Sequence, residues 1–449
     1  MARLHKEHPE AVAALRDAAI PLADHRAHEP IASAIGDAPL VLLGEATHGT
    51  HDFYALRAQV TRALIERHGF TAVAIEGDWP DAWRVNRFVQ HTGPDTHAVP
   101  ALNGFARFPT WMWRNTAVAD FIGWLRAHNA AVRAPGQRVG FYGLDLYSLH
   151  ASMRAVVAYL EERDPAAAAA ARHSYACFDQ YGPEADTYGW ATTRLGHATC
   201  EEAVARELVA LHERRTALVR GDGVHADDEF FFAEQNARVA RNAEQYYRSM
   251  FRGRVASWNL RDEHMVETLQ ELMAHLRRRG QAPKVIVWAH NSHVGDARAT
   301  DMGREGELNL GQLVRERITP EARLIGFTTH AGTVIAASDW GGEPELKQVR
   351  PALPDSVEAL FHQTGVPRFF LPLRHGSPAY RVLAEPRLER AIGVVYRPDT
   401  ERLSHCFNAR VAEQFDAIIH LDETGAVDPL PGQLVRDTTE VPETYPSGV

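Results

Sequence analysis

Short apolar runs alternate along most of this chain with longer segments whose apolar residues recur at helical spacing. The run 41–43 ends at a glycine, and the later segment 53–68 carries an apolar stripe with helical periodicity. Alternation of this kind predicts an α/β fold with a largely parallel central sheet flanked by helices. The runs that predict strands are 41–43, 72–75, 139–142, 285–288, 324–327, 368–371, 393–396 and 417–420.

The middle of the chain lacks this alternation. From about residue 152 to residue 279 the pattern favours helix, and the alanine-rich run 165–172 is typical of it. We therefore expect a mostly helical insertion that covers the active-site cleft, because a cap over strand ends encloses a small-molecule pocket. The expected division is 1–150 for the first part of the α/β core, 151–280 for the helical insertion or cap, 281–427 for the second part of the core and 428–449 for an extended C-terminal tail.

Composition and charge narrow the class of protein. The chain has 449 residues and a net charge of -10, which argues against nucleic acid or an anionic membrane as a partner. We find neither the apolar core of a secretory signal nor an apolar run long enough to span a bilayer. Cys177, Cys200 and Cys406 form no close pair and no metal-type spacing, so we expect a reducing, cytoplasmic location. No feature indicates an oligomeric state.

The first strand-like run delivers a carboxylate and an imidazole to its C-terminal end. Glu45 and His48 come after Gly44, at the sheet edge where ligands bind in open α/β folds. An imidazole titrates near neutrality and suits a general base, and a nearby carboxylate can fix its tautomer. The alternative is a helix N-terminus capped by Thr47, with His48 in a structural role.

Carboxylates also follow the second run, at Glu76 and Asp78. Pro80 at the start of the next helical segment favours a helix-capping role for Asp78. Glu76 ends a buried strand and needs a compensating partner. Arg57 is a candidate for that partner, although the sequence is equally compatible with a surface position for this arginine.

A pair of histidines follows the run 285–288. His290 and His293 can share one side of a tight turn and converge on one ligand, and their spacing also suits half of a metal site. Alternatively, backbone carbonyls at a strand-to-loop corner satisfy both rings. Ser292 between them lacks the flanking glycines of a nucleophile elbow, and no Gly-x-Ser-x-Gly motif occurs, which disfavours a covalent acyl-enzyme.

The aromatic segment 105–113 is a candidate lining for an apolar substrate pocket. Hydrophobic anchoring of a loop is the more common use of such residues. The substrate-binding candidates are Phe108, Trp111, Met112 and Trp113. Asp145 falls at another predicted strand end, where turn formation explains it equally well.

These segments together resemble the erythromycin esterase family. The similar segments are 44–49, 75–79, 108–113, 241–247, 258–262 and 288–293, in the family's order, within a match from about residue 39 to residue 420. The resemblance implies an α/β core, a helical portion over a deep electronegative cleft, and hydrolysis of a macrolide lactone by some members, with a link to antibiotic resistance. It also implies that no metal or other cofactor is needed.

The resemblance assigns roles to residues as well. It implies His48 as the group that activates water, Glu45 and Glu76 as supporting carboxylates, and Arg57, His290 and His293 as the remaining members of the site. We expect a hydrolase of a small-molecule ester or lactone, with the oxyanion met by one of the last three. Two alternatives stay open: a metal-dependent hydrolase using the same cluster, and a protein that binds a small molecule or metal complex without transforming it.

Overall fold

The computed structural model describes residues 9–22, 26–182, 185–219 and 224–431. Within these residues, nine strands form a central sheet in the order β1-β8-β11-β6-β2-β5-β3-β4, with β7 beside β6. The strands are β1 (Ile20–Pro21), β2 (Leu40–Leu43), β3 (Ala72–Asp78), β4 (Gly140–Asp145), β5 (Val285–Trp288), β6 (Arg323–Ala336), β7 (Glu345–Val349), β8 (Arg368–Pro372) and β11 (Ala417–Thr424). A second, two-stranded sheet pairs β9 (Arg387–Arg390) with β10 (Cys406–Ala409).

The predicted α/β fold with a largely parallel sheet is confirmed. The pairings that join β11, β6, β2, β5, β3 and β4 are parallel, while β1, β7 and β8 pair antiparallel to their neighbours. β2 and β5 are buried along their whole length, which explains their unbroken apolar sequence. Their side chains alternate between two hydrophobic clusters: Val41 and Leu43 belong to one, Leu40 and Leu42 to the other.

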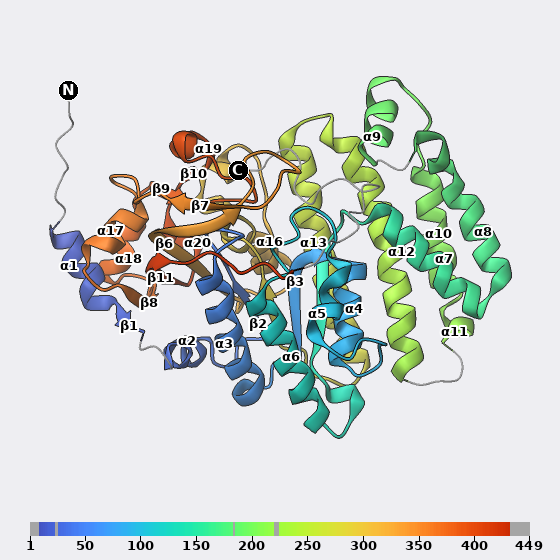
Figure 1. Cartoon of the computed structure of the whole chain (residues 1–449), viewed down its shortest axis with the longest axis horizontal. Helices are drawn as coiled ribbons and strands as arrows, with labels where there is room; N and C mark the ends of the chain where they lie inside the picture. Colours follow the sequence, from blue (N-terminus) through green and yellow to red (C-terminus); the bar gives the residue numbers. More distant parts are fainter. Residues whose placement is uncertain (1–8, 23–25, 183–184, 220–223, 432–449) are drawn as a thin grey trace.

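Helices cover both faces of this sheet (Figure 1). The cluster that contains Val41 includes side chains of α2 (His28–Ile35), α3 (His51–His68) and α6 (Thr116–Ala131). The cluster that contains Leu42 includes side chains of α1 (Pro9–Ala18), α13 (Arg254–Arg278), α16 (Leu310–Arg317), α17 (Val357–Gln363) and α18 (Pro378–Leu383). α4 (Trp79–Val89) contributes to both clusters. The shorter helices are α5 (Ala98–Ala101), α14 (Asn291–Val294), α15 (Asp301–Arg304), α19 (Glu401–Ser404) and α20 (Val411–Gln414).

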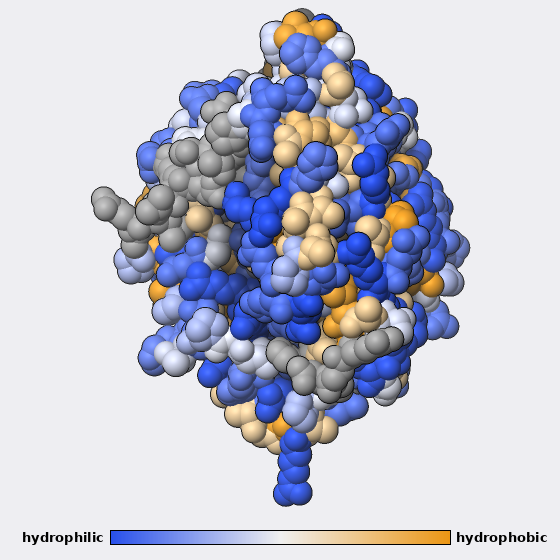
Figure 2. Space-filling model, turned by 90° about the vertical axis from the view of Figure 1, so that its right-hand side faces the viewer, coloured by the Kyte–Doolittle hydropathy of each residue, from blue (hydrophilic) through white to orange (hydrophobic). Residues whose placement is uncertain are grey.

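The segment between α7 and α13 is helical, as predicted. Its described residues contain no strand, and its helices bury a hydrophobic cluster separate from the two clusters of the sheet. These helices lie to one side of the sheet (Figure 1). The face of the molecule on this side carries hydrophilic residues with more hydrophobic ones along its middle (Figure 2). The helices before α13 are α7 (Leu149–Arg163), α8 (Pro165–Tyr175), α9 (Ala185–Arg194), α10 (Glu201–Glu213), α11 (Arg215–Leu218) and α12 (Val224–Met250). The domain boundaries at 151, 281 and 428 stay predictions.

The run 393–396 does not form the predicted strand. Its neighbour Ile392 and its own Val395 make only isolated bridges, to Thr47 and Ala337. The run is apolar because Ile392 and Tyr396 pack against side chains of β6 in a small buried cluster. Conversely, β7 was not predicted, because four of its five residues are not buried and it carries no apolar pattern.

Two cysteines that are distant in sequence form a disulfide. Cys177 and Cys200 are bonded, with Cα atoms 5.9 Å apart and a sequence separation of 23, and Cys406 is free. The spacing of the cysteines does not predict this bond, because helix packing brings together two residues that are 23 positions apart in the sequence. The cysteine content consequently no longer argues for a reducing compartment.

The structure also bears on the membrane prediction and on the C-terminal tail. In the part of the chain that the structure describes, no helix is long and apolar enough to cross a membrane. Before the tail leaves the described residues, Leu430 N donates a hydrogen bond to Arg114 O at 2.9 Å. Residues 432–449 of the predicted tail lie outside the described residues.

Candidate active site

Glu45 and His48 form a hydrogen-bonded pair just beyond β2. His48 Nδ1 lies 2.9 Å from Glu45 Oε1, and both side chains are buried, with 4% of His48 exposed. A carboxylate only accepts hydrogen bonds, so His48 Nδ1 carries the proton and donates a hydrogen bond to Glu45. Thr47 shows no side-chain capping of α3, whose N-cap is Thr50, so the capping alternative for this motif is not what the structure shows.

Arg57, in the first half of α3, is the third member of the group that contains Glu45 and His48. Its Nη2 donates to Glu45 Oε2 at 2.7 Å, and its guanidinium lies over the rings of Tyr54 and Trp288, 4.4 and 5.2 Å from the centroids. Arg57 is fully buried. The predicted pairing of Arg57 with Glu76 is therefore wrong, because the helix that follows β2 points this side chain back at the carboxylate of its own motif.

The partner of Glu76 is Arg261, which comes from α13. Arg261 Nη2 donates to Glu76 Oε1 at 2.8 Å and to Asp145 Oδ2 at 2.5 Å, so one guanidinium joins the ends of β3 and β4. Asp145 is thus part of the site and not only a turn former. Asp78 stands at the N-cap position of α4 without a side-chain capping bond and pairs with Arg107, so its predicted capping role is wrong.

His290 lies against His48. Their ring centroids are 4.8 Å apart, and His290 N donates to Glu76 Oε2 at 2.8 Å. His290 Nδ1 accepts the backbone N–H of Ser292 at 3.2 Å, which leaves the proton of the neutral ring on Nε2. That Nε2 is buried and has no hydrogen-bond partner among the described residues. The structure therefore brings together His48 and His290, which follow two different predicted strands.

His293 lies among charged side chains. Its Nδ1 lies 2.9 Å from Asp262 Oδ1, its Nε2 lies 3.3 Å from Glu76 Oε1, and its ring stacks on Trp258 at 4.5 Å between centroids. Arg261 Nη1 also lies 3.0 Å from His293 Nε2. The side chains that make these contacts enclose His293, which is buried.

Three pKa values in this cluster are displaced. Burial disfavours charge on Glu76, but His293 and Arg261 outweigh it and hold the pKa of this carboxyl well below its usual range. Burial and the neighbouring imidazole lower the pKa of His290 well below the ordinary value. His293 is equally buried, yet Asp262 and Glu76 raise its pKa to about 9. These shifts favour the charged forms of Glu76 and His293 and the neutral form of His290.

The aromatic candidates lie mostly in the core. Trp111, Met112 and Trp113 are buried, whereas Phe108 is partly exposed and packs edge-on against Trp111. Trp113 Nε1 donates to Glu76 O at 3.0 Å, which fixes the end of β3. Contact of these four residues with a substrate stays a prediction.

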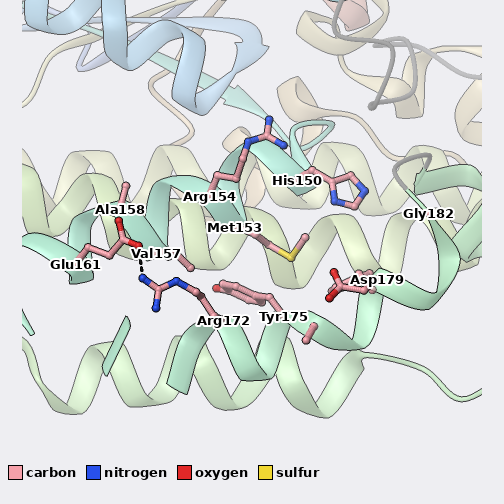
Figure 3. Close-up of a pocket in the computed structure, with 12 residues that line it drawn as sticks. His150, Met153, Arg154, Val157, Ala158, Glu161, Arg172, Tyr175, Asp179 and Gly182 are labelled. Atoms are coloured by element: carbon pink, nitrogen blue, oxygen red, sulfur yellow. Dashed lines mark hydrogen bonds and ion pairs between the residues drawn. The ribbon is translucent and has the colours of Figure 1, made fainter. Parts of the chain in front are cut away.

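Two cavities differ in their relation to the site. One of about 410 Å³ is lined by Ser292, whose Oγ lies 2.8 Å from His290 Nδ1, and by Trp258. The other, of about 710 Å³, lies among the helices between α7 and α8, where Met153 and Tyr175 face each other (Figure 3). Of these two cavities, the smaller one borders residues that contact His290 and His293.

Arg261, Asp262 and Trp258 received no individual role from the sequence. Their only signal is that segment 258–262 resembles a family segment, while helical periodicity alone marks α13 as ordinary.

The contacts of the predicted histidines do not favour the metal-dependent alternative. His48 Nδ1 and His293 Nδ1 are engaged by carboxylates, and the predicted cluster is not among the metal-compatible groups of the described residues.

A family model for erythromycin esterase matches residues 65–424. The chain belongs to the erythromycin esterase family. The match includes Glu76, His290 and His293 and begins after Glu45, His48 and Arg57. Membership in this family supports an esterase, and therefore a hydrolase.

Two relatives carry the name of this family, and two solved structures share the fold. The chain is 22% identical to erythromycin esterase type II of Escherichia coli over 77% of this chain and 83% of that protein. It is 21% identical to type I of Escherichia coli over 70% and 75%. In fold it is similar to a succinoglycan biosynthesis protein (TM-score 0.74, 20% identity, 96% and 100% covered). A mutant of the erythromycin esterase EreC in its open conformation is also similar (TM-score 0.64, 18% identity, 91% and 96% covered).

Proposed function

We propose that this protein hydrolyses a small-molecule ester or lactone with a water molecule that His48 activates, without a covalent acyl-enzyme. The observation that carries the proposal is the chain of contacts from Arg57 through Glu45 to His48, with the His290 ring 4.8 Å from that of His48. This arrangement supplies a base and a hydrogen-bond donor side by side.

His48 has the tautomer that a general base needs. Because Nδ1–H is held by Glu45 at 2.9 Å, the lone pair of the neutral ring is on Nε2. Arg57 neutralises Glu45 and fixes its orientation, so the carboxylate keeps the ring in place. In this mechanism Nε2 removes a proton from water while the water oxygen attacks the carbonyl carbon, and then returns the proton to the leaving alkoxide.

His290 is the best-placed donor to the developing oxyanion. Its pKa is lowered by burial and by His48, so it stays neutral, and its Nε2–H has no partner among the described residues. A neutral N–H that is already held in position stabilises negative charge without reorganisation. Arg57 and His293 are the other candidates for this role. Arg57 is fully buried against Tyr54 and Trp288 and bonds Glu45, although its Nε and Nη1 have no hydrogen-bond partner among the described residues. His293 is held by Asp262, Glu76 and Arg261, so we assign both residues a positioning role.

The family and the cavity that borders Ser292 support an ester or lactone as the substrate class. The relatives carry the name erythromycin esterase, so a macrolide lactone is the first substrate to test. The 410 Å³ cavity combines apolar side chains, among them Met302 and Phe407, with the charged Arg254. Such a mixture suits a largely apolar ester with polar substituents.

The test is a panel of macrolide lactones and linear esters, assayed by mass spectrometry for the gain of one water. We expect His48→Asn to lose a factor of about 10²–10⁴ in kcat, the usual contribution of a general base. His97→Asn, at an exposed histidine, is the matched control and keeps full activity. A folded His48→Asn protein with wild-type turnover would contradict the proposal. Activity that a chelator abolishes would favour the metal-dependent alternative, and binding without turnover across the panel the non-catalytic one.

A further inference from the structure

A group of two histidines and an aspartate lies where β6, β11 and α17 meet, outside the candidate active site. Its members are His330 on β6, His362 on α17 and Asp422 on β11. One ligand atom from each lies within 4.8 Å of the others, and among the described residues this is the group of His, Cys, Asp or Glu that meets such a criterion. β6 and β11 are neighbours in the sheet on the side of β2 away from β5.

The register of the two parallel strands places these side chains on one face. Leu421 pairs with Thr329 and Glu423 with Ala331, so Asp422 lies beside His330. Because side chains alternate along a strand, His420 shares the face of Asp422, and α17 brings His362 to the same place. Three separate segments of the chain, β6, α17 and β11, therefore converge at this group through the fold and not through a local motif.

The present contacts leave one nitrogen unsatisfied. His362 Nδ1 lies 2.8 and 3.0 Å from the two oxygens of Asp422, and His420 Nε2 lies 3.3 Å from Oδ1. The ring of His330 stacks on that of His362, with centroids 3.7 Å apart. His330 Nδ1 is buried and has no hydrogen-bond partner among the described residues. A buried polar atom without a partner calls for an explanation.

We propose that His330, His362 and Asp422 bind a divalent transition-metal ion of the zinc type. Imidazole nitrogens with one carboxylate oxygen are ligands that Zn²⁺ favours, and water can complete the coordination. At the usual Zn–N and Zn–O lengths, a tetrahedral ion holds N and O about 3.3 Å apart. The His362–Asp422 contact therefore has to widen by only a few tenths of an ångström.

Binding requires two further changes, both of which the surroundings permit. The stacked rings are within 8° of parallel, so one ring has to turn to aim its lone pair at the ion. The His362 side chain is 49% exposed and has room to do so. The proton that His362 Nδ1 shares with Asp422 leaves to solvent when the ion takes its place. His420 keeps its hydrogen bond to Asp422 and orients the carboxylate.

The bound ion would fasten α17 to β6 and β11, independently of the hydrolase reaction. The test is isothermal titration of chelator-treated full-length protein with ZnCl₂. We expect one equivalent to bind to the wild type, and the His330→Ala/His362→Ala double variant to bind that equivalent at least about 100-fold more weakly. The control His173→Ala, at an exposed histidine of α8, binds as the wild type does.

A second measurement keeps the test independent of how the variants fold. Crystals of the wild type soaked in ZnCl₂ should show an anomalous peak between His330, His362 and Asp422. Zinc binding that the double variant retains, a peak only at the His48–His290 pair, or no binding by the wild type would each overturn the proposal. Hydrolase activity does not enter this test, so failure of the zinc site leaves the proposed function untouched.

Discussion

The two halves of the candidate active site are built differently. The Glu45–His48–Arg57 group comes from a single stretch of β2 and α3, and its contacts span at most 12 positions in sequence. The Glu76–Arg261 contact, in contrast, spans 185 positions and joins the sheet to α13. We infer that the local half supplies the proton chemistry, while the remote half holds the strand ends and His290 in place.

Breaking the local half should have the largest effect on the rate. In Glu45→Gln the amide can donate to His48 Nδ1, so the proton moves to Nε2 and the base is lost. We expect kcat to fall by about 10⁴, as when a catalytic histidine is held in the wrong tautomer. Steady-state kinetics at a temperature where circular dichroism shows the variant folded measures this. A loss of less than tenfold would contradict the assigned role of Glu45.

Breaking the remote half should act first on stability. Arg261→Met leaves the buried carboxylate of Asp145 without its cation and Glu76 with His293 alone, which costs about 3–5 kcal/mol. Denaturant unfolding measures this loss. Arg277→Met, at an exposed position of the same helix, should change the free energy of unfolding by less than about 0.5 kcal/mol. Equal stability of the two variants would mean that Arg261 does not hold the strand ends together.

A smaller effect is expected on the pH dependence of the free energy of unfolding. The pKa of His293 is raised to about 9 although the ring is buried, because Asp262 and Glu76 favour its charged form. The folded state therefore binds this proton more tightly than the unfolded state, so the stabilisation is complete below the unfolded pKa of about 6.5 and disappears as the pH rises through 9.

The measurement is the free energy of unfolding of the wild type and of Asp262→Asn as the pH rises from 6 to 10. In the wild type it should decline between about pH 6.5 and 9, and in Asp262→Asn this decline should be weaker. Identical profiles would show that Asp262 does not set the charge of His293.

The same contrast explains what could be predicted from sequence. Unbroken apolar runs predict the buried parallel strands. Glu45 and His48 are close enough in sequence for their pairing to be expected. Arg261 and Asp262 were assigned no role, because nothing in the periodicity of α13 distinguishes a buried arginine at a strand end from a solvated one. Arg57 was assigned the wrong carboxylate for the same reason, since the direction of a helical side chain depends on how the helix packs.

Tertiary packing also explains the other places where the structure differs from the predictions made from the sequence. The run 393–396 is apolar because Tyr396 packs on β6 and because Val394 and Val395 join a larger hydrophobic cluster of the sheet. No local pattern separates that use from a strand. The Cys177–Cys200 bond and the His330–His362–Asp422 group likewise join positions that are remote in sequence. Residues that meet only through the fold carry no spacing signal.

The most direct test of the central claim is the protonation state of the two facing imidazoles. Nitrogen-15 NMR of the histidine rings near neutral pH, assigned with His48→Gln and His290→Gln, reports which nitrogen of each ring carries hydrogen. We expect opposite tautomers, with the proton on Nδ1 of His48 and on Nε2 of His290. A proton on Nε2 of His48, or the same tautomer in both rings, would contradict the assignment of one as base and the other as donor.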